Sequence, residues 1–321
     1  MAIEHARAHE LPKPWGVADL RPWRDAGQRD ELIGEIWYER PGESAPNSSL
    51  LLKLLFTSQP LSIQVHPDDA YAQSIGLPNG KTEAWYILSA APDAQVALGL
   101  KRLMPPQKLR EAIEDGSISN LVAWRTASAG DVIFVPAGTI HAIGAGFVIA
   151  ELQQRSDATF RMFDYGRKRE LHVENAVAVA DAKAAGLQVQ PRRLNNERTL
   201  LVSNPHFVLE RFDLPANSSW YLRADRETWL LVVGGGAHTG SFGVAPGDAI
   251  FLELDRVNID VGSAGLAGLL AYTGTGRTPD LQRRLCLSAA SDTESTYEAV
   301  LPASLTQTTV EPGRECIAVI Q

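Results

Sequence analysis

The chain has 321 residues, of which 45% are hydrophobic and 21% are charged. These proportions are typical of a soluble globular protein, and the length is sufficient for two cores of ordinary domain size. The net charge of −8 disfavours nucleic acid and anionic membranes as partners, because an acidic surface repels both.

Short strands separated by Gly, Pro, Asn and Asp account for most of the structure that the sequence predicts. In chain order, the predicted strands are 50–56, 61–66, 83–89, 95–100, 132–135 and 147–153. Helices are predicted at 68–75, 105–115 and 173–185, the second with Pro at its start and Gly directly after its end. Closely spaced short strands favour a barrel or sandwich, so these helices are additions to a mainly β fold.

Two pairs of segments recur in the same order, which indicates an internal duplication. Glu83-Ala-Trp-Tyr-Ile-Leu88 is similar to Glu227-Thr-Trp-Leu-Leu-Val232, and Gly130-Asp-Val-Ile-Phe-Val135 is similar to Gly247-Asp-Ala-Ile-Phe-Leu252. We therefore predict two related β domains, residues 1–190 and 191–321. Their boundary is placed within about five residues of 190, where a polar stretch carries Pro191.

The first copy contains an insertion. Its landmarks lie 47 positions apart (130 minus 83) and those of the second copy only 20 (247 minus 227), a difference of 27 residues. The insert is predicted to be helical and to occupy about residues 101–127. It either packs over one end of the barrel or forms a wall over an active site.

Four side chains of the first copy form a candidate metal site. Gln64 and His66 lie two positions apart on a predicted strand, so their side chains point to the same face. Glu83 begins the next predicted strand, and His141 follows the turn at 136–139 and is expected on a strand beside 131–135. An amide, two imidazoles and a carboxylate suit Zn²⁺, with Fe²⁺, Mn²⁺, Co²⁺ and Ni²⁺ as alternatives.

The duplication supports a metal role for these histidines. The residue 11 positions beyond Gly130 is His141, whereas the residue 11 positions beyond Gly247 is Asn258. The strand predicted at 207–212 likewise contains no Gln-x-His pair. Histidines are thus absent where only the fold is repeated, as a metal site restricted to the first barrel predicts. The remaining histidines are interpreted as surface or core residues: His5, His9, His172, His206 and His238.

Four motifs resemble those of the type I mannose-6-phosphate isomerases, in particular the short bacterial form. They are Gln64-Val-His-Pro-Asp-Asp69, Gly80-Lys-Thr-Glu-Ala-Trp-Tyr86, Val135-Pro-Ala-Gly-Thr-Ile-His141 and Glu151-Leu-Gln-Gln-Arg-Ser-Asp-Ala-Thr-Phe-Arg161. They occur in family order and spacing, whereas the second half resembles only a degenerate cupin without ligands. The resemblance implies two cupin-like jelly-roll barrels, of which the first is catalytic.

The resemblance also implies an activity and residue roles. The family interconverts mannose 6-phosphate and fructose 6-phosphate with zinc, and Gln64, His66, Glu83 and His141 match its ligand positions. Arg161 matches the arginine assigned as catalytic, and Ser62 is a phosphate contact by resemblance or else an ordinary strand serine. Arg155 departs from the usual asparagine; it is expected on a strand, pointing outward, with no function.

Aldose–ketose isomerisation moves a proton between C2 and C1 through an enediolate, so it needs a base and a group that stabilises negative charge. A metal would be the fixed positive centre. Arg161 holds its proton too firmly to act as the base, so it is predicted to stabilise the enediolate or grip an oxyanion. Its structural alternative is an ion pair with Asp157 or Asp164.

Two residues are candidates for the base. Glu151 lies ten positions before Arg161, and an unbroken strand would put both on one face. Lys81 lies two positions from Glu83, and a nearby cation would lower its pKa. The sequence leaves the choice between them open.

Two other functions fit the sequence. One is a cupin metalloenzyme of different chemistry, such as an iron oxygenase or an isomerase of another sugar. The other is a sugar-binding or regulatory cupin without turnover, against which the combination of Lys81, Glu151 and Arg161 argues. The expected partner is a small sugar phosphate, with no nucleic acid or membrane, and the expected assembly is a monomer or small homo-oligomer.

The remaining expectations concern location and the cysteines. No apolar run reaches the roughly 20 residues that span a bilayer, and the first ten residues contain charged side chains rather than an apolar secretory signal. A cytoplasmic protein is therefore expected. Cys286 and Cys316 form no Cys-x-x-Cys or Cys/His cluster and are predicted to be packing residues.

Overall fold

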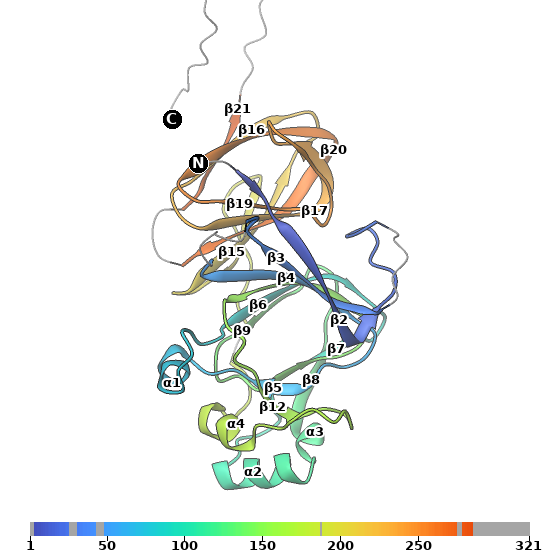
Figure 1. The fold of residues 1–321 in the computed structure, drawn as a ribbon, viewed down its shortest axis with the longest axis vertical. Coiled ribbons are helices and arrows are strands. Elements are labelled where there is room, and N and C mark those ends of the chain that lie inside the picture. Colours follow the sequence, from blue (N-terminus) through green and yellow to red (C-terminus); the bar gives the residue numbers. More distant parts are fainter. Residues whose placement is uncertain (1–2, 26–30, 43–47, 187, 275–277, 285–321) are drawn as a thin grey trace, which may run out of the picture. The chain divides into compact units, whose positions relative to one another are not determined.

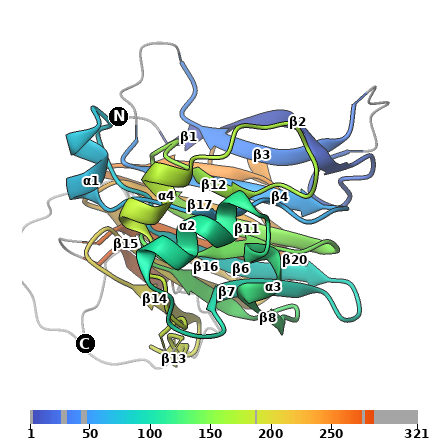
Figure 2. The same ribbon diagram turned by 90° about the horizontal axis from the view of Figure 1, so that it is seen from below.

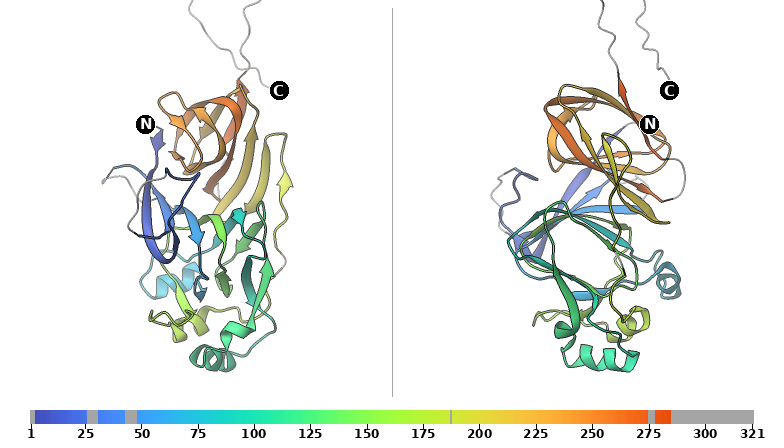
Figure 3. Two further views of the ribbon diagram at one scale, coloured as in Figure 1. Left: turned by 90° about the vertical axis from the view of Figure 1, so that its right-hand side faces the viewer. Right: turned by 180° about the vertical axis from the view of Figure 1, so that it is seen from behind.

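The computed structural model describes residues 3–25, 31–42, 48–186, 188–274 and 278–284. Met1–Leu285 forms one compact unit, and within it the described chain is mainly β, as predicted. Two barrels built from different stretches of the chain are visible in Figures 1 and 3. The predictions for Cys286 and Cys316 lie outside the described residues.

The first barrel is formed by two antiparallel sheets. The larger has the strand order β2 (Arg7–Val17), β3 (Ile33–Glu39), β4 (Leu50–Thr57), β11 (Phe147–Gln154), β6 (Glu83–Ala90) and β9 (Val132–Val135). The smaller has the order β12 (Phe160–Phe163), β5 (Ile63–Val65), β10 (His141–Ile143), β7 (Gln95–Leu100) and β8 (Val122–Thr126). All six predicted strands are present within this barrel.

Short helices lie outside the first barrel, most of them on the side of the small sheet (Figures 1 and 2). They are α1 (Asp69–Ser74), α2 (Pro106–Glu114), α3 (Ile118–Leu121) and α4 (Val173–Val179). Helix α2 buries Leu109 and Ile113 in the core that also contains β5 and β12 residues, and an Arg110–Glu174 ion pair joins it to α4. The inserted segment therefore packs against the small sheet, on the face that carries Ile63 and Val65, and not over the barrel end.

The predicted helix 173–185 is too long. Helix α4 ends at Val179, because Ala180 takes an extended conformation. The following residues form isolated bridges instead, Asp181 with Thr139 and Ala184 with Gly99. Backbone pairing with the barrel replaces further helical turns.

The second barrel is formed by a ten-stranded sheet. Its strands are β1 (Glu4–His5), β13 (Arg192–Arg193), β14 (Arg198–Ser203), β15 (Phe207–Leu214), β16 (Ser219–Ala224), β17 (Thr228–His238), β18 (Gly243–Val244), β19 (Ala249–Leu252), β20 (Asp255–Thr273) and β21 (Asp280–Arg284). Strand β1 pairs with β19, so the N-terminal residues contribute to this sheet. The domain limits at 190 and 191 stay a prediction.

The duplicated glycine turns have the same structure in both barrels. Gly130 and Gly247 have φ angles of 91° and 92°, a left-handed conformation that glycine adopts without strain. The Gly130 N–H donates to Ile87 O at 2.8 Å, and the Gly247 N–H donates to Val232 O at 3.0 Å. The aspartate that follows each glycine accepts from the backbone N–H three residues before it. The sequence repeat therefore corresponds to a repeated strand connection.

Strand alternation divides the large sheet of the first barrel into two faces. Leu52 and Leu54 of β4 pack with Leu209 and Trp229 of the second barrel in one core. Leu55 of the same strand belongs to a different core, together with Trp85 of β6. This second face lines the inside of the first barrel and, because Lys53 and Glu151 are directly paired on β4 and β11, it carries their side chains.

Candidate metal centre

One row of side chains crosses the small sheet of the first barrel. His141 of β10 lies opposite Gln64 of β5, and Arg161 of β12 lies opposite Gln64 on the other side. Residues directly opposite one another in a sheet project from the same face. The sheet therefore places these three side chains beside one another, although they are up to 97 positions apart in the sequence (161 minus 64).

The predicted position of the His141 strand is wrong. Strand β9 pairs with β6 in the large sheet, whereas β10 pairs with β5 and β7 in the small one. The turn at 136–139 carries the chain from one sheet to the other, and the Gly138 N–H donates to His66 O at 2.8 Å. This crossing brings His141 to Gln64 and His66.

His66, Glu83 and His141 form a buried cluster whose ligand atoms all lie within 4.8 Å of one another. Each residue is 1% exposed. Glu83 Oε1 lies 3.2 Å from His66 Nε2, and Glu83 Oε2 lies 3.8 Å from His141 Nε2. The imidazole centroids are 4.7 Å apart, so both rings are close enough to share one ion.

The hydrogen bonds of both histidines fix their tautomers. His66 Nδ1 contacts Ala158 O at 2.7 Å, and His141 Nδ1 contacts Thr139 O at 2.8 Å. A carbonyl oxygen only accepts, so each Nδ1 carries the proton and each Nε2 presents its lone pair to Glu83. This backbone anchoring of the second ring nitrogen is typical of metal-binding histidines.

Among the described residues, the buried His66 Nε2 lacks a hydrogen-bond donor, and the contact of Glu83 Oε1 with a donor is its ion pair with Lys81 Nζ at 3.1 Å. Burial, with Lys81 nearby, lowers the pKa of His66 to about 3 and also lowers the pKa of His141, so both rings are neutral at physiological pH. Neutral Nε2 atoms and a carboxylate oxygen all accept. A buried set of facing acceptors calls for a cation, and a divalent metal fits this donor set.

Burial alone would raise the pKa of Glu83, but the ammonium of Lys81 outweighs it and holds the pKa well below its usual range. Lys81 Nζ lies 3.1 Å from Glu83 Oε1. Burial would lower the pKa of Lys81, yet Glu83 and Glu151 outweigh it and raise that pKa. The lowering of the Lys81 pKa by a bound cation stays a prediction.

Glu151 is linked to the cluster through an indole. The Trp85 N–H donates to Glu83 Oε2 at 3.2 Å and to Glu151 Oε1 at 3.0 Å. Burial and the charge of Glu83 raise the pKa of Glu151. A carboxyl group that faces the interior of the barrel beside the cluster is placed for proton transfer.

Lys53 is a site residue that the sequence reasoning missed. Its Nζ lies 3.2 Å from Glu151 Oε2 and donates to Gln153 Oε1 at 2.6 Å. It also lies 4.8 Å from the centroid of the Trp37 ring. The signal was available, because Lys53 is the only charged residue in the apolar segment 50–56, and a buried lysine requires partners.

Glu151 and Arg161 do not share an unbroken strand. Strand β11 ends at Gln154 in the large sheet, and β12 begins at Phe160 in the small one. Their side chains approach the interior from two sheets instead of one face. Arg155 falls in the bend directly after β11, so its predicted strand position is also wrong.

Arg161 is not paired with either suggested aspartate. Its Nη1 donates to Glu170 O at 2.7 Å, and its buried Nε has no hydrogen-bond partner among the described residues. Asp164 is engaged by Arg167 and Arg169. Burial lowers the pKa of Arg161, but an arginine remains charged, so this guanidinium retains donor capacity for an anion.

Ser62 contacts the glutamine of the row. Its hydroxyl donates to Gln64 Oε1 at 3.0 Å, and Gln64 Nε2 lies 3.4 Å from His141 Nε2. Ser62 is 3% exposed. Its hydroxyl therefore orients the Gln64 amide.

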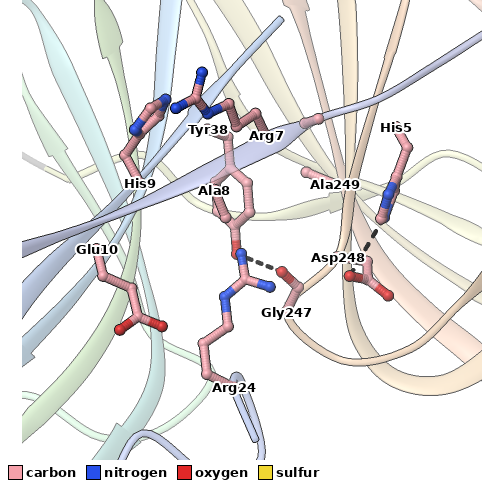
Figure 4. Close-up of a pocket in the computed structure, with 11 residues that line it drawn as sticks. His5, Arg7, Ala8, His9, Glu10, Arg24, Tyr38, Gly247, Asp248 and Ala249 are labelled. Atoms are coloured by element: carbon pink, nitrogen blue, oxygen red, sulfur yellow. Dashed lines mark hydrogen bonds and ion pairs between the residues drawn. The ribbon is translucent and has the colours of Figure 1, made fainter. Parts of the chain in front are cut away.

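His5 and His9 lie apart from the cluster. His5 Nε2 lies 3.4 Å from Asp248, and His9 Nε2 lies 2.9 Å from Glu39. Both line a separate hollow of about 470 Å³ beside the turn at Gly247, where the Tyr38 hydroxyl donates to Gly247 O (Figure 4). This hollow includes no residue of the cluster.

Sequence comparisons find mannose-6-phosphate isomerases. The chain is 40% identical over 177 residues to "Mannose-6-phosphate isomerase" from Streptococcus mutans serotype c, covering 51% of this chain and 54% of the relative. It is 40% identical over 139 residues to "Mannose-6-phosphate isomerase ManA" from Bacillus subtilis strain 168, covering 41% and 44%. The matched region thus spans about half the length of these curated relatives. No model of a protein family matches the chain.

Structural comparisons cover more of the chain. The crystal structure of mannose 6-phosphate isomerase from Bacillus subtilis has a TM-score of 0.71 and 25% identity, covering 84% of this chain and 99% of that one. A mutant phosphomannose isomerase from Salmonella typhimurium has a TM-score of 0.68 and 15% identity, covering 86% and 100%, which shows a shared fold. Among the described residues, no helix is long and apolar enough to cross a bilayer. These comparisons confirm the resemblance drawn from the motifs: the chain is similar to mannose-6-phosphate isomerases, in sequence over about half its length and in fold over most of it.

Proposed function

We propose that the chain is a metal-dependent isomerase that interconverts mannose 6-phosphate and fructose 6-phosphate. The observation that carries this proposal is the buried His66–Glu83–His141 cluster, whose facing acceptor atoms call for a cation. The names of the relatives support the choice of substrate. An unpaired Arg161 nitrogen and a buried Glu151 beside the cluster supply the charge and the proton acceptor that isomerisation needs.

We assign the metal ligands to Gln64, His66, Glu83 and His141, and the ion to zinc. Two imidazoles and a carboxylate are a common zinc donor set, and the fixed tautomers of the imidazoles support it. Ligation by Gln64 through its oxygen would require its amide to turn over. The Ser62 hydroxyl would then accept from the amide NH₂ instead of donating to Oε1, so Ser62 would still orient the ligand. When bound, the ion would supply positive charge that stabilises negative charge on the substrate oxygens.

We assign proton transfer to Glu151. Its carboxylate would remove the C2 proton of the aldose to give the enediolate and return that proton to C1 of the enediolate, while the hydroxyl proton on O2 moves to O1 to give the ketose. Lys53 and the Trp85 indole hold the two carboxylate oxygens in place, which fixes the orientation of the base. Lys81, paired with Glu83, would remain a cation and donate to a substrate oxygen.

Arg161 would grip a substrate oxyanion. Its position opposite Gln64 puts it in the same row as the proposed ligands, and its Nε is free to donate. We infer that Ser62 orients Gln64, in place of the phosphate contact implied by the family resemblance.

The direct test is to incubate the purified, metal-analysed protein with fructose 6-phosphate and identify the product. Formation of mannose 6-phosphate that stops after chelation and resumes with zinc is expected. Binding of the sugar phosphate without any product would favour the regulatory cupin instead, and turnover of a different sugar would reassign the substrate. Cytoplasmic location, a monomeric or small homo-oligomeric state, and the absence of nucleic-acid or membrane partners stay predictions from the sequence.

A further inference from the structure

The backbone beside His66 is in unusually close contact with the segment that leads to Glu83. The Lys81 N–H donates to Pro67 O at 3.0 Å. A Cβ on Gly80 would lie 2.4 Å from the carbonyl carbon of Asp68 and 2.6 Å from Pro67 O, so only glycine fits there. The segments that carry two of the proposed ligands are therefore packed backbone to backbone.

A carboxylate oxygen of Asp69 joins the segment before Glu83 to the end of β11. Asp69 Oδ1 accepts from the Gly80 N–H at 2.8 Å and from Gln154 Nε2 at 2.9 Å. Gln154 Oε1 in turn accepts from the Thr82 N–H at 3.0 Å. The side chains of Asp69 and Gln154 thus hold the backbone N–H groups of residues 80 and 82, immediately before Glu83.

The segment before His141 is attached to the same place. The Gly138 N–H donates to His66 O at 2.8 Å, and the Ala137 N–H donates to Thr82 Oγ1 at 3.3 Å. Gln154 is 6% exposed, and an unpaired buried amide would be costly, so its two side-chain bonds are both required. Hydrogen bonds around Asp69 and Gln154 therefore connect the backbones that carry His66, Glu83 and His141.

We propose that Asp69 and Gln154 form a latch that holds the three ligand-bearing segments in register and so preorganises the metal site. Asp69 and Gln154 are positioning residues, because the groups that they contact in the ligand-bearing segments are backbone N–H groups and each other. The other carboxylate oxygen of Asp69 lies 3.8 Å from His206 Nδ1. The proposal deepens the proposed function and rests on it for the identity of the ion. The hydrogen bonds of the latch to residues 80 and 82 are made within the protein, so we expect them with or without bound metal.

The variants Asp69→Ala and Gln154→Met test the latch, with Asp68→Ala as the matched control. Asp68 is the neighbouring carboxylate, but its side chain accepts from the Tyr71 N–H as the cap of α1. Among the described residues, it makes no hydrogen bond to the Gly80 N–H or to Gln154. Asp68→Ala therefore reproduces any fraying of α1 without opening the latch. Asp69→Asn retains an oxygen that can accept from Gly80.

The first measurement is the rate at which zinc-loaded protein releases zinc to a chelator. Loss of a group that supports metal ligands typically costs about 10–100-fold in metal affinity, so we expect release to accelerate by about that factor in Asp69→Ala and Gln154→Met. Asp68→Ala should release zinc at the wild-type rate, and Asp69→Asn should recover most of the loss. Equal release rates in Asp69→Ala and Asp68→Ala would overturn the proposal.

The second measurement is hydrogen exchange in the metal-free protein. The amides of Gly80 and Thr82 should exchange faster in Asp69→Ala and Gln154→Met than in the wild type or Asp68→Ala. Unchanged protection of both amides would also overturn the latch. If the wild type neither retains zinc nor isomerises sugar phosphate, the proposed function fails, but this exchange measurement still decides whether the latch exists.

Discussion

The two barrels contain the same Glu-x-Trp sequence and use it in opposite ways. In both, the indole N–H donates to the glutamate two residues earlier, at 3.2 Å from Trp85 to Glu83 and 3.1 Å from Trp229 to Glu227. Trp85, however, belongs to the core inside the first barrel, whereas Trp229 belongs to the core between the barrels. Glu83 meets two imidazoles, and Glu227 accepts from the backbone N–H groups at the start of β4.

A one-residue difference in strand register explains why the two Glu-x-Trp segments face different cores. Trp85 pairs with Ile133, the third residue after Gly130, whereas Trp229 pairs with Phe251, the fourth residue after Gly247. Successive side chains of a strand point to opposite faces, so a shift of one residue exchanges the buried faces. The similar sequences therefore form the same strand and turn in both barrels. The strand register differs, so Glu83 faces the candidate metal centre and Glu227 faces the junction between the barrels.

The strongest test of this contrast is Glu83→Gln. We expect loss of bound metal and a fall in turnover of at least about a thousandfold, because metal charge stabilisation is worth several kcal/mol and each 1.36 kcal/mol is tenfold in rate. Glutamine has nearly the same shape, so circular dichroism should show a preserved fold. Metal analysis and the isomerase assay decide the outcome. Stoichiometric metal together with normal turnover would remove Glu83 from the site.

Arg161→Ala tests whether Arg161, which lies in one row with Gln64 and His141 on the small sheet, stabilises negative charge on the substrate. Loss of one oriented donor to a developing oxyanion typically costs about 10²–10³ in turnover, so we expect a fall of at least about a hundredfold with metal content and fold retained.

The matched control is Arg155→Ala, which removes a guanidinium that donates to the Ser48 hydroxyl. It should leave turnover near the wild-type value. Equal activity in the two variants would reject a catalytic role for Arg161.

Glu227→Gln tests whether the glutamate of the second barrel contributes to stability at the junction between the barrels. The carboxylate accepts from the Ser49 N–H at 2.6 Å and the Leu50 N–H at 2.9 Å, and hydrogen bonds to a charged group contribute about 1.5–3 kcal/mol each. We expect the free energy of unfolding to fall by about 1–3 kcal/mol in urea titration. Metal content and turnover per folded molecule should stay at the wild-type values, and loss of metal would show that the two glutamates are functionally coupled.

Much of the fold and the identity of the cluster followed from the sequence. Short apolar segments separated by Gly, Pro, Asn and Asp defined the strands, and the absence of histidines at the matching positions of the second copy distinguished His66 and His141. These signals are local, or are comparisons between aligned local segments. They needed no knowledge of which strands pair.

The errors concern contacts between strands. The crossing of the chain at 136–139 from one sheet to the other was not visible, so His141 was expected beside β9. The break between β11 and β12 likewise invalidated the even-spacing argument for Glu151 and Arg161. The charge of Lys53 within an apolar segment was visible in the sequence, but its partner Glu151 is identified only when β4 is paired with β11. Sheet pairing is a long-range property, and a single sequence gives little information about it.

The variant with the smallest expected effect is Asn258→His. It tests whether positions that match in the sequence repeat also place their side chains in the same way. Asn258 lies 11 positions after Gly247, as His141 lies 11 after Gly130, and a simple alignment suggests that Asn258→His would restore a ligand. In the structure Asn258 is exposed on β20, opposite Tyr221 of β16, while its neighbours Val257 and Ile259 are buried.

The new imidazole of Asn258→His would therefore face solvent, far from any group arranged like Glu83. We expect a change in the free energy of unfolding within about 0.5 kcal/mol and the same metal content as the wild type. A second equivalent of bound zinc would mean that position 258 can turn inward, and that the register of the second barrel is less firmly fixed than its pairing indicates.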